Sequence, residues 1–148
     1  MYFKIIKAKK NNAKQIGELF DLYRQFYNYK SELKKSTKYI KERISKKDST
    51  IFVCLHDNEA CGFVQLYETF DSLNINKKLI LYDLYVKENF RTKGIGKKLM
   101  NTAKKFAIKK KINIIELSTA ITNKKAQSLY ESLEYIRDKE YYNYYLEL

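Results

Sequence analysis

Apolar residues recur along the chain at two different spacings, which predict a fold that mixes strands with helices. Residues 2–7 alternate between polar and apolar side chains, as in a strand with one buried face. A helix is predicted to begin after Asn11 or Asn12, and a shorter one to follow Ser36, because asparagine and serine both cap helices well. The apolar stripes of these helices contain Ile16, Leu19, Phe20, Tyr23, Phe26 and Tyr27, and then Tyr39, Ile40 and Ile44.

A β-hairpin is predicted in the middle of the chain. Residues 51–56 and 61–69 have the apolar composition of strands, and they flank the dipeptide Asp57-Asn58. Asp and Asn tolerate the left-handed backbone that a two-residue hairpin turn requires. The two strands are therefore expected to pair antiparallel.

The second half of the chain alternates strands with helices. In order, the pattern predicts a polar loop at 70–76, an apolar strand at 78–86, a helix at 94–110, a strand at 112–118, a helix capped by Asn123, and strands at 135–137 and 141–146. The strand–helix–strand unit predicts a parallel pair with a crossover helix. The fold class is therefore α/β, in the order β-α-α-β-β-β-α-β-α-β-β, with a mixed sheet and helices on both faces.

Length and composition favour a single domain over residues 1–148. Proline is absent and only four glycines occur, so no linker is indicated. No apolar stretch approaches the ~20 residues that a membrane span needs, and the N-terminus does not resemble a secretory signal. We therefore expect a cytoplasmic protein without a membrane partner.

The formal net charge of +13 comes mostly from lysine. Lysine, asparagine, isoleucine and tyrosine are all abundant and have A/T-rich codons, so a low-GC genome accounts for much of this charge. Only four arginines occur, although arginine is the usual planar partner of phosphate and guanine. No nucleic-acid partner is expected, although a positive field would attract an anionic coenzyme.

The cysteines and the single histidine do not indicate a metal site. The hairpin would place Cys54 opposite Cys61, and we expect both to be reduced, half-buried thiols because cytosolic disulfides are uncommon. Two cysteines and His56 are too few ligands for a credible metal centre.

The most informative segment is Arg91-Thr92-Lys93-Gly94-Ile95-Gly96, which follows a strand and opens a helix. Free main-chain N–H groups and the positive end of the helix dipole would meet there, together with the charges of Arg91, Lys93 and Lys97. Such a helix start is an anion site. A Walker loop is excluded because Arg91 and Lys98 stand where it needs glycine and Ser or Thr. A dinucleotide fingerprint is excluded because Leu99 replaces its third glycine.

This segment resembles motif A of the GNAT superfamily of N-acetyltransferases, in which Arg or Gln is followed by two residues, Gly, any residue, and Gly or Ala. Arg91, Gly94 and Gly96 match this motif. The helix after residue 122 resembles motif B through Asn123, Ala126, Leu129, Tyr130 and Leu133. The order of elements is also the family's, so the resemblance covers nearly the whole chain. Glu134-Tyr135 departs from it, since the family usually has Gly-Phe there.

The resemblance implies acetyl-CoA as co-substrate and a sheet splayed between its fourth and fifth strands. The loop amides from Arg91 to Gly96 would bind the pyrophosphate, and Leu84 and Val86 would pair with the pantetheine arm. The residues implied to contact the coenzyme are Leu84, Tyr85, Val86, Arg91, Thr92, Lys93, Gly94, Ile95, Gly96, Lys97, Ser118, Asn123 and Tyr130.

Acetyl transfer to an amine needs a neutral amine, a stabilised thioester oxygen and a proton for the leaving thiolate. The main-chain N–H of Leu84 or Tyr85 would stabilise the oxygen. The resemblance implies that Tyr130 is the general acid, whereas its place on an apolar stripe also suits a core residue.

The base and the acceptor site are less well defined by the sequence. Asp83 is the only acid in its apolar strand, so it either pairs with a lysine or meets the substrate amine. Its motif looks like that of polyamine and diamine acetyltransferases, although Tyr82 stands where these have Glu. The predicted substrate-binding residues are Tyr23, Tyr27, Glu68, Tyr82 and Asp83, and Glu116 is a further candidate base.

The sequence thus predicts an N-acetyltransferase that acts on a primary amine of a polyamine-like or amino-acid-like small molecule. A protein N-terminus or lysine is the alternative acceptor, and a basic nucleic-acid-binding module is the alternative from another class. A homodimer is left open, because the tyrosine-rich last strand would suit a subunit contact.

Overall fold

The computed structural model describes residues 1–148, which form two compact units, Met1–Ser118 and Thr119–Leu148. The first unit contains β1 (Lys4–Lys7), α1 (Ala13–Phe26), α2 (Leu33–Lys46), β2 (Thr50–His56), β3 (Glu59–Asp71), β4 (Asn76–Val86), α3 (Ile95–Lys109) and β5 (Ile115–Glu116). The second unit contains α4 (Lys124–Ser132). Short 3-10 turns at Lys10–Asn12 and Glu88–Phe90 precede α1 and α3.

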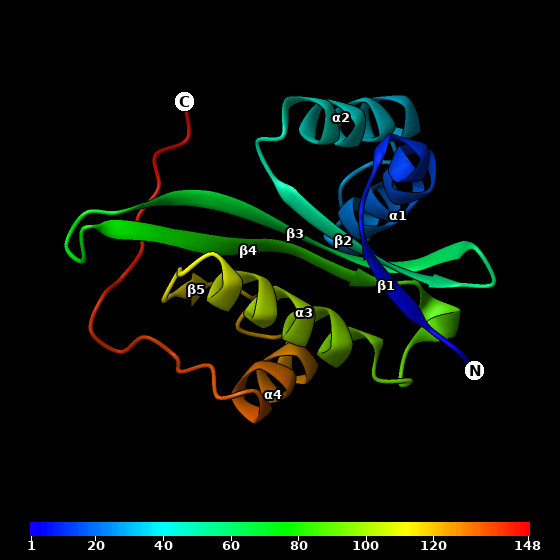
Figure 1. The fold of residues 1–148 in the computed structure, drawn as a ribbon. Helices are drawn as coiled ribbons and strands as arrows, with labels where there is room; N and C mark the ends of the chain where they lie inside the picture. Colours follow the sequence, from blue (N-terminus) through cyan, green and yellow to red (C-terminus); the bar gives the residue numbers. More distant parts are fainter. The chain divides into compact units, whose positions relative to one another are not determined.

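The first unit is built on a five-stranded sheet in the order β1-β2-β3-β4-β5. The first four strands pair antiparallel, and β5 pairs parallel with β4 across the crossover helix α3. Helices α1 and α2 cover one face of the sheet, and α3 covers the other (Figure 1). The mixed sheet and its helices on both faces confirm the predicted fold class.

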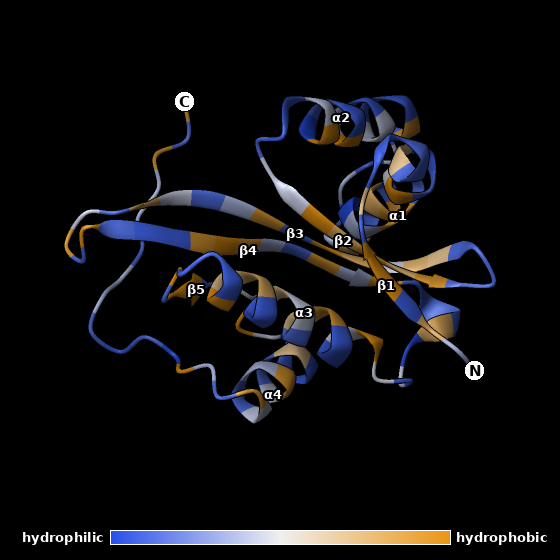
Figure 2. Ribbon diagram, viewed as in Figure 1, coloured by the Kyte–Doolittle hydropathy of each residue, from blue (hydrophilic) through white to orange (hydrophobic).

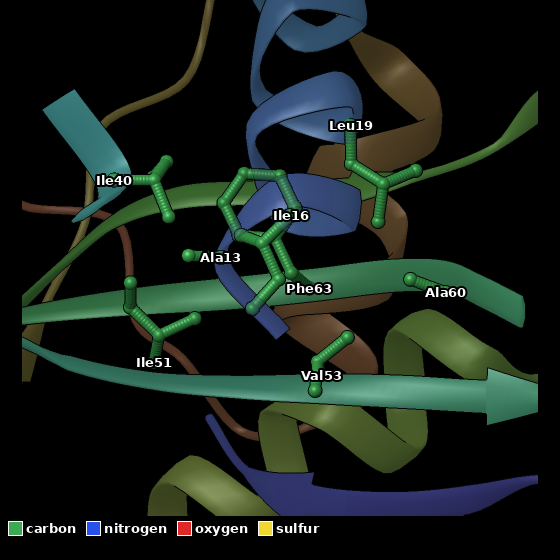
Figure 3. Packing of buried hydrophobic residues seen from close by; sticks show 8 residues of the cluster. All are labelled: Ala13, Ile16, Leu19, Ile40, Ile51, Val53, Ala60 and Phe63. Atoms are coloured by element: carbon green, nitrogen blue, oxygen red, sulfur yellow. The ribbon is translucent and has the colours of Figure 1, made fainter. Parts of the chain in front are cut away.

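One hydrophobic cluster of the core lies between the sheet and the pair α1 and α2. It consists of Ala13, Ile16, Leu19, Ile40, Ile51, Val53, Ala60 and Phe63 (Figure 3). Alternate residues of β2 face opposite sides, so Ile51 and Val53 join this cluster, while the ring of Phe52 lies 5.6 Å from that of Phe106 in α3. Burial on both faces explains why β2 is a continuous apolar run, which Figure 2 shows as a hydrophobic centre of the sheet.

The hairpin turn forms as predicted, but its register differs. Asp57 and Asn58 have φ angles of 48° and 64°, the left-handed values expected of a two-residue turn. A β-bulge then places Gly62 opposite Cys54, so the expected pairing of Cys54 with Cys61 was wrong. Both thiols are free and fully buried, not half-buried, and the Cys61 thiol donates to the carbonyl of Cys54 at 3.3 Å.

The connection from α1 to α2 is organised by a buried carboxylate that the sequence did not single out. Asp21 accepts hydrogen bonds from the hydroxyls of Ser31 (2.6 Å) and Ser36 (2.8 Å) and from the main-chain N–H of Glu32 (2.9 Å). Helix α2 therefore begins at Leu33, and the prediction that it follows Ser36 was wrong. The serine lies inside the helix because its hydroxyl serves Asp21.

The predicted ends of other elements also change. The first strand begins at Lys4, not at residue 2, and the loop after β3 is shorter than predicted, because β3 and β4 continue to Asp71 and from Asn76. Asn12 precedes α1 but does not cap it. Its side-chain oxygen accepts instead from the N–H of Lys9 at 2.9 Å, which closes the 3-10 turn.

The last predicted strands are absent. Residues 135–137 and 141–146 form no strand, and the second unit contains no strand with which they could pair. An isolated extended segment has no ladder to stabilise it, so an apolar pattern alone does not make a strand. The cap of α4 is confirmed, since the Asn123 side chain accepts from the N–H of Ala126 at 3.2 Å.

We predict that Asp21→Asn lowers the free energy of unfolding by about 2–3 kcal/mol, because Asp21 accepts hydrogen bonds at both carboxylate oxygens and the amide nitrogen of asparagine cannot accept any. Burial raises the pKa of Asp21, but its hydrogen bonds outweigh burial and hold the pKa below the usual value. The stabilisation is thus present above the unfolded pKa and is lost as pH falls through the folded pKa.

Urea denaturation between pH 3 and pH 7 measures this effect. Glu18→Gln is the matched control, because Glu18 is an exposed acid on the same helix. An unchanged midpoint for Asp21→Asn at pH 7 would contradict the prediction.

Candidate active site

One edge of β4 is open over half its length. Strand β5 pairs with β4 only at Leu79 and Ile80, so the predicted strand at 112–118 is reduced to Ile115–Glu116. Residues 81–86 of β4 still pair with β3 on their other side. The sheet is therefore splayed between β4 and β5, as the resemblance implied.

A β-bulge decides which main-chain groups face this open edge. On the β5 side, the N–H of Leu79 donates to the main-chain carbonyl of Ile114 at 3.1 Å. On the β3 side, the N–H of Lys87 donates to the main-chain carbonyl of Cys61 at 2.9 Å. Alternate residues face alternate sides, so the alternation reverses between these two odd-numbered residues. The reversal occurs at Tyr82, the extra residue where the register with β3 shifts.

The main-chain N–H groups of Leu84 and Val86 consequently face the open edge, and that of Tyr85 faces β3. The carbonyl of Val86 already accepts from the Nε of Arg91 at 2.9 Å. The open edge therefore offers donors at two alternate positions, which is the spacing that an added extended chain requires.

The start of α3 adds a second group of donors at the end of β4. Gly94, which has a φ of 77°, is the residue just before α3. The first helical hydrogen bond runs from the N–H of Lys98 to the carbonyl of Gly94 at 3.1 Å. The N–H groups of Ile95, Gly96 and Lys97 therefore have no acceptor within the helix, and no side chain caps them. The first turn contains no acidic residue. These features suit the helix start to the binding of an anion.

The side chain of Arg91 anchors the loop between β4 and α3. Besides its bond to Val86, its guanidinium carbon lies 5.4 Å from the ring centroid of Tyr85 and 5.6 Å from that of Phe26. The guanidinium thus ties the loop to β4 and to the end of α1. Thr92, at a φ of 63°, turns the chain between these anchors and Gly94.

Asp83 is a buried carboxylate without a basic partner. Its side chain is 3% exposed, and its Oδ2 accepts from the Nε2 of Gln65 at 2.6 Å. It forms no ion pair with any lysine, arginine or histidine, so the alternative of a lysine salt bridge was wrong. Burial raises the pKa of Asp83, and its hydrogen bonds with Gln65 and Tyr23 lower it by less.

Three tyrosines interact with Asp83, namely Tyr23 and Tyr27 from α1 and Tyr67 from β3, and the ring of Tyr67 contacts that of Tyr82 from β4. We call these four residues the tyrosine shell. The ring centroids of Tyr23 and Tyr27 lie 5.2 Å apart, and those of Tyr67 and Tyr82 lie 5.7 Å apart. Burial is the chief cause that raises the pKa of Tyr23, Tyr27 and Tyr67. The charge of Asp83 comes next for Tyr23 and Tyr27, whereas for Tyr67 it follows the hydrogen bond with Tyr39. The Tyr23 hydroxyl also donates to the carbonyl of Tyr82 at 3.2 Å, at the bulge.

The structure does not bring the other predicted acids to this site. Glu68 alternates with Tyr67 on β3 and so faces the opposite side, where it pairs with Lys77 at 3.5 Å. Glu116 pairs with Lys78 at 3.3 Å on β5. Gln65 was not among the predicted site residues, and its only signal in the sequence was a polar side chain inside an apolar strand.

The remaining predicted residues lie at and beyond the boundary between the units. Ser118 ends the first unit. In the second unit, the carbonyl of Tyr130 accepts from the N–H groups of Leu133 (3.1 Å) and Tyr135 (3.0 Å), and the rings of Tyr130 and Tyr135 lie 6.2 Å apart. Asn123 and Tyr130 thus occupy the beginning and the last turn of α4.

A splayed mixed sheet with donors at the β4 edge and at the start of α3 defines a class of protein that binds an extended, anionic coenzyme. The profile of the Acetyltransferase (GNAT) family matches residues 16–135. The chain belongs to this family and is an N-acetyltransferase of the GNAT type. The family uses acetyl-CoA as co-substrate.

Two relatives resemble this chain over nearly its whole length. The chain is 37% identical over 142 residues to an uncharacterized N-acetyltransferase, YhfO, of Bacillus subtilis, covering 96% of this chain and 95% of that one. The crystal structure of a probable acetyltransferase matches with a TM-score of 0.91 and 34% identity over 98% of this chain and 97% of the other.

Two more distant relatives have names that specify an acceptor. N-alpha-acetyltransferase 30 of Xenopus laevis is 37% identical over 78 residues, which cover 50% of this chain and 29% of that protein. Thialysine N-epsilon-acetyltransferase of Caenorhabditis elegans is 23% identical over 134 residues, which cover 90% of this chain and 83% of that one.

No helix of the structure has the length and apolar character that a membrane crossing demands.

We predict that Lys97→Glu weakens the binding of coenzyme A by roughly tenfold, since near a protein surface a charge a few Å away contributes more than about 1 kcal/mol. Calorimetric titration with coenzyme A measures the affinity. Lys105→Glu is the control, because Lys105 is an exposed lysine farther along the same helix and the change in net charge is equal. Equal losses in both variants would show that only the overall field matters.

Proposed function

We propose that this enzyme transfers the acetyl group of acetyl-CoA to a primary amine of a small, cationic, polyamine-like molecule. The observation that carries this proposal is Asp83, a buried carboxylate inside the tyrosine shell that no basic side chain neutralises. A charge buried in this way is costly unless a partner compensates it. Tyrosine rings also attract cations through their faces. A substrate ammonium would therefore supply the missing countercharge.

The coenzyme would be held by main-chain donors that have no acceptor in the protein. The N–H groups at the start of α3 suit the pyrophosphate, and those of Leu84 and Val86 suit the amides of the pantetheine arm. Arg91, Thr92 and Lys93 would shape and charge this loop. The placement of Ser118 beside the arm and of Asn123 at the coenzyme rests on the family resemblance.

The open edge of β4 could also stabilise the negative charge that develops on the thioester oxygen during the reaction. The N–H of Leu84 points to the open edge, so it can donate to the thioester oxygen as negative charge develops on it. The N–H of Tyr85 is directed to β3, which favours Leu84 for this role. When bound, acetyl-CoA supplies the activated acetyl group that the neutral amine attacks directly.

Tyr130 is proposed as the general acid that protonates the leaving thiolate. A tyrosine hydroxyl carries its proton at neutral pH and can give it to a thiolate as the bond to carbon breaks. The assignment rests on the match of the α4 sequence with motif B.

Asp83 suits the binding of a retained ammonium better than the removal of a proton. An alkylammonium has a pKa of about 10.4, far above that of a carboxyl group even when burial raises it, so proton transfer between them is strongly uphill. A diamine would place one charged nitrogen at Asp83 and present its other, neutral nitrogen to the acetyl group. The C. elegans thialysine enzyme, which is named for the acetylation of a small amine, supports this choice.

A protein N-terminus is the second candidate acceptor. The match with N-alpha-acetyltransferase 30 favours it, although it covers half of this chain. A peptide acceptor presents one amine and no second cation, so Asp83 would have no evident partner in that case.

We predict that 1,4-diaminobutane is acetylated with a kcat/KM roughly tenfold or more above that of 1-aminobutane, and that 4-aminobutanoate is the poorest of the three. The acceptors share a four-carbon chain and differ in the charge of the distal group, and tenfold corresponds to about 1.4 kcal/mol. The release of coenzyme A thiol measures turnover. Equal rates for all three, with rapid acetylation of peptides, would instead favour the N-terminal acceptor.

We also predict that Tyr130→Phe lowers kcat by about 10²-fold while the KM for acetyl-CoA changes little, because a general acid acts in the transition state. Tyr135→Phe is the control, since its ring neighbours that of Tyr130 in the same unit. An undiminished kcat in Tyr130→Phe would assign this tyrosine to the core.

A further inference from the structure

Gln65 is a fully buried carboxamide in the middle of β3, directly opposite Asp83 in the strand register. Both ends of its side chain are hydrogen-bonded. Its Oε1 accepts from the hydroxyl of Ser49 at 2.8 Å, and its Nε2 donates to Oδ2 of Asp83 at 2.6 Å. Burying a carboxamide in an apolar strand is costly unless it is hydrogen-bonded, and both of these bonds are needed to offset that cost.

The direction of this network is determined by chemistry. An ionised carboxylate can only accept hydrogen bonds, so Asp83 requires the donor end of the amide. The Ser49 hydroxyl could donate or accept, so the carboxylate sets which end of the amide faces it, and the hydroxyl donates to the opposite end. Serine and glutamine together form a directional support beneath the carboxylate.

We propose that Gln65, held by Ser49, is a positioning residue that orients the Asp83 carboxylate toward the tyrosine shell for the binding of the substrate ammonium. This inference rests on the proposed function, in which Asp83 binds that cation. Gln65 itself does not touch the substrate. It acts by donating a hydrogen bond to one carboxylate oxygen, Oδ2, and so holding the carboxyl group in place.

The surroundings of Asp83 make this single donor influential. The titratable groups that interact with it are Tyr23 and Tyr27 from α1 and Tyr67 from β3, and no basic group is among its electrostatic partners. The hydrogen bond from Gln65 is the main influence that lowers the pKa of Asp83 against burial. Its removal would leave the carboxyl protonated, and unable to bind a cation, up to a higher pH.

The test compares Gln65→Met with the wild type in the pH dependence of diamine kinetics. Methionine keeps the length of the side chain and removes the donor. We expect the KM for 1,4-diaminobutane to rise at least tenfold at low pH, with kcat nearly unchanged. The acid limb of kcat/KM should move up by about one to two pH units, the effect of losing one hydrogen bond to a charged group.

Two further variants separate positioning from stability. Ser49→Ala should shift the acid limb in the same direction by less, because the amide keeps its donor but loses the hydrogen bond that holds its other end. Ser36→Ala is the control, since it removes a similarly buried hydrogen bond, to Asp21, far along the chain from Asp83. It should lower stability without moving the acid limb.

Asp83→Asn distinguishes the two levels of the proposal. If Asp83→Asn leaves the KM for the diamine unchanged, the proposed binding of the cation fails, and the role of Gln65 fails with it. If Asp83→Asn raises the KM while folded Gln65→Met and Ser49→Ala both keep the wild-type pH profile, only the positioning role is overturned. If Gln65→Met has no further effect in the Asp83→Asn background, the two residues act as one unit.

Discussion

The geometry of this enzyme depends on one extra residue in β4. Tyr82 forms a bulge against β3, and the hydrogen-bonding direction of the strand reverses there. Before the bulge, β4 pairs with β5; after it, the N–H groups of Leu84 and Val86 face an edge that β5 does not reach. A regular strand of the same length would direct these donors into the ladder with β3. The bulge thus lets one strand complete the sheet and also offer donors to an extended ligand.

The same bulge arranges the opposite side of the strand. The ring of Tyr82 contacts that of Tyr67, and Asp83 bonds to Gln65, although Tyr82 and Asp83 are consecutive residues. Gln65 and Tyr67 share one face of β3, so both β4 side chains lie on the face covered by α1 and α2. Asp83 is therefore placed among aromatic rings next to the edge where Leu84 offers its N–H. Main-chain donors that suit an extended ligand and a carboxylate that suits a cation then lie within a few residues of each other.

The sequence predicted those parts of the fold that local chemistry determines. Gly94 marked the left-handed start of α3, Asn123 marked the cap of α4, and Asp57-Asn58 marked the hairpin turn, because each conformation favours particular residues nearby. The sequence did not show the bulge at Tyr82 or the shortness of β5. Both are set by how strands pair across space, and an apolar run looks the same whether or not a partner strand continues beside it. Alternation on β3 and β4 therefore could not reveal that Glu68 and Asp83 face opposite sides.

The role of Asp83 could not be assigned from the sequence for the same reason, because it depends on contacts made across space. An acid in an apolar strand is compatible with a salt bridge, and the chain has thirty basic residues that could provide one. None of them does so, and the support comes instead from a neutral amide and a ring of phenols. A carboxylate with a basic partner is electrostatically satisfied and stabilises the fold at most modestly. Asp21 is also buried, but its four neutral donors outweigh its burial. The donors of Asp83 do not, so this carboxylate keeps an unmet attraction for a cation, and groups in this condition are typical of binding sites. In a protein rich in lysine, that attraction would be available to a cationic substrate.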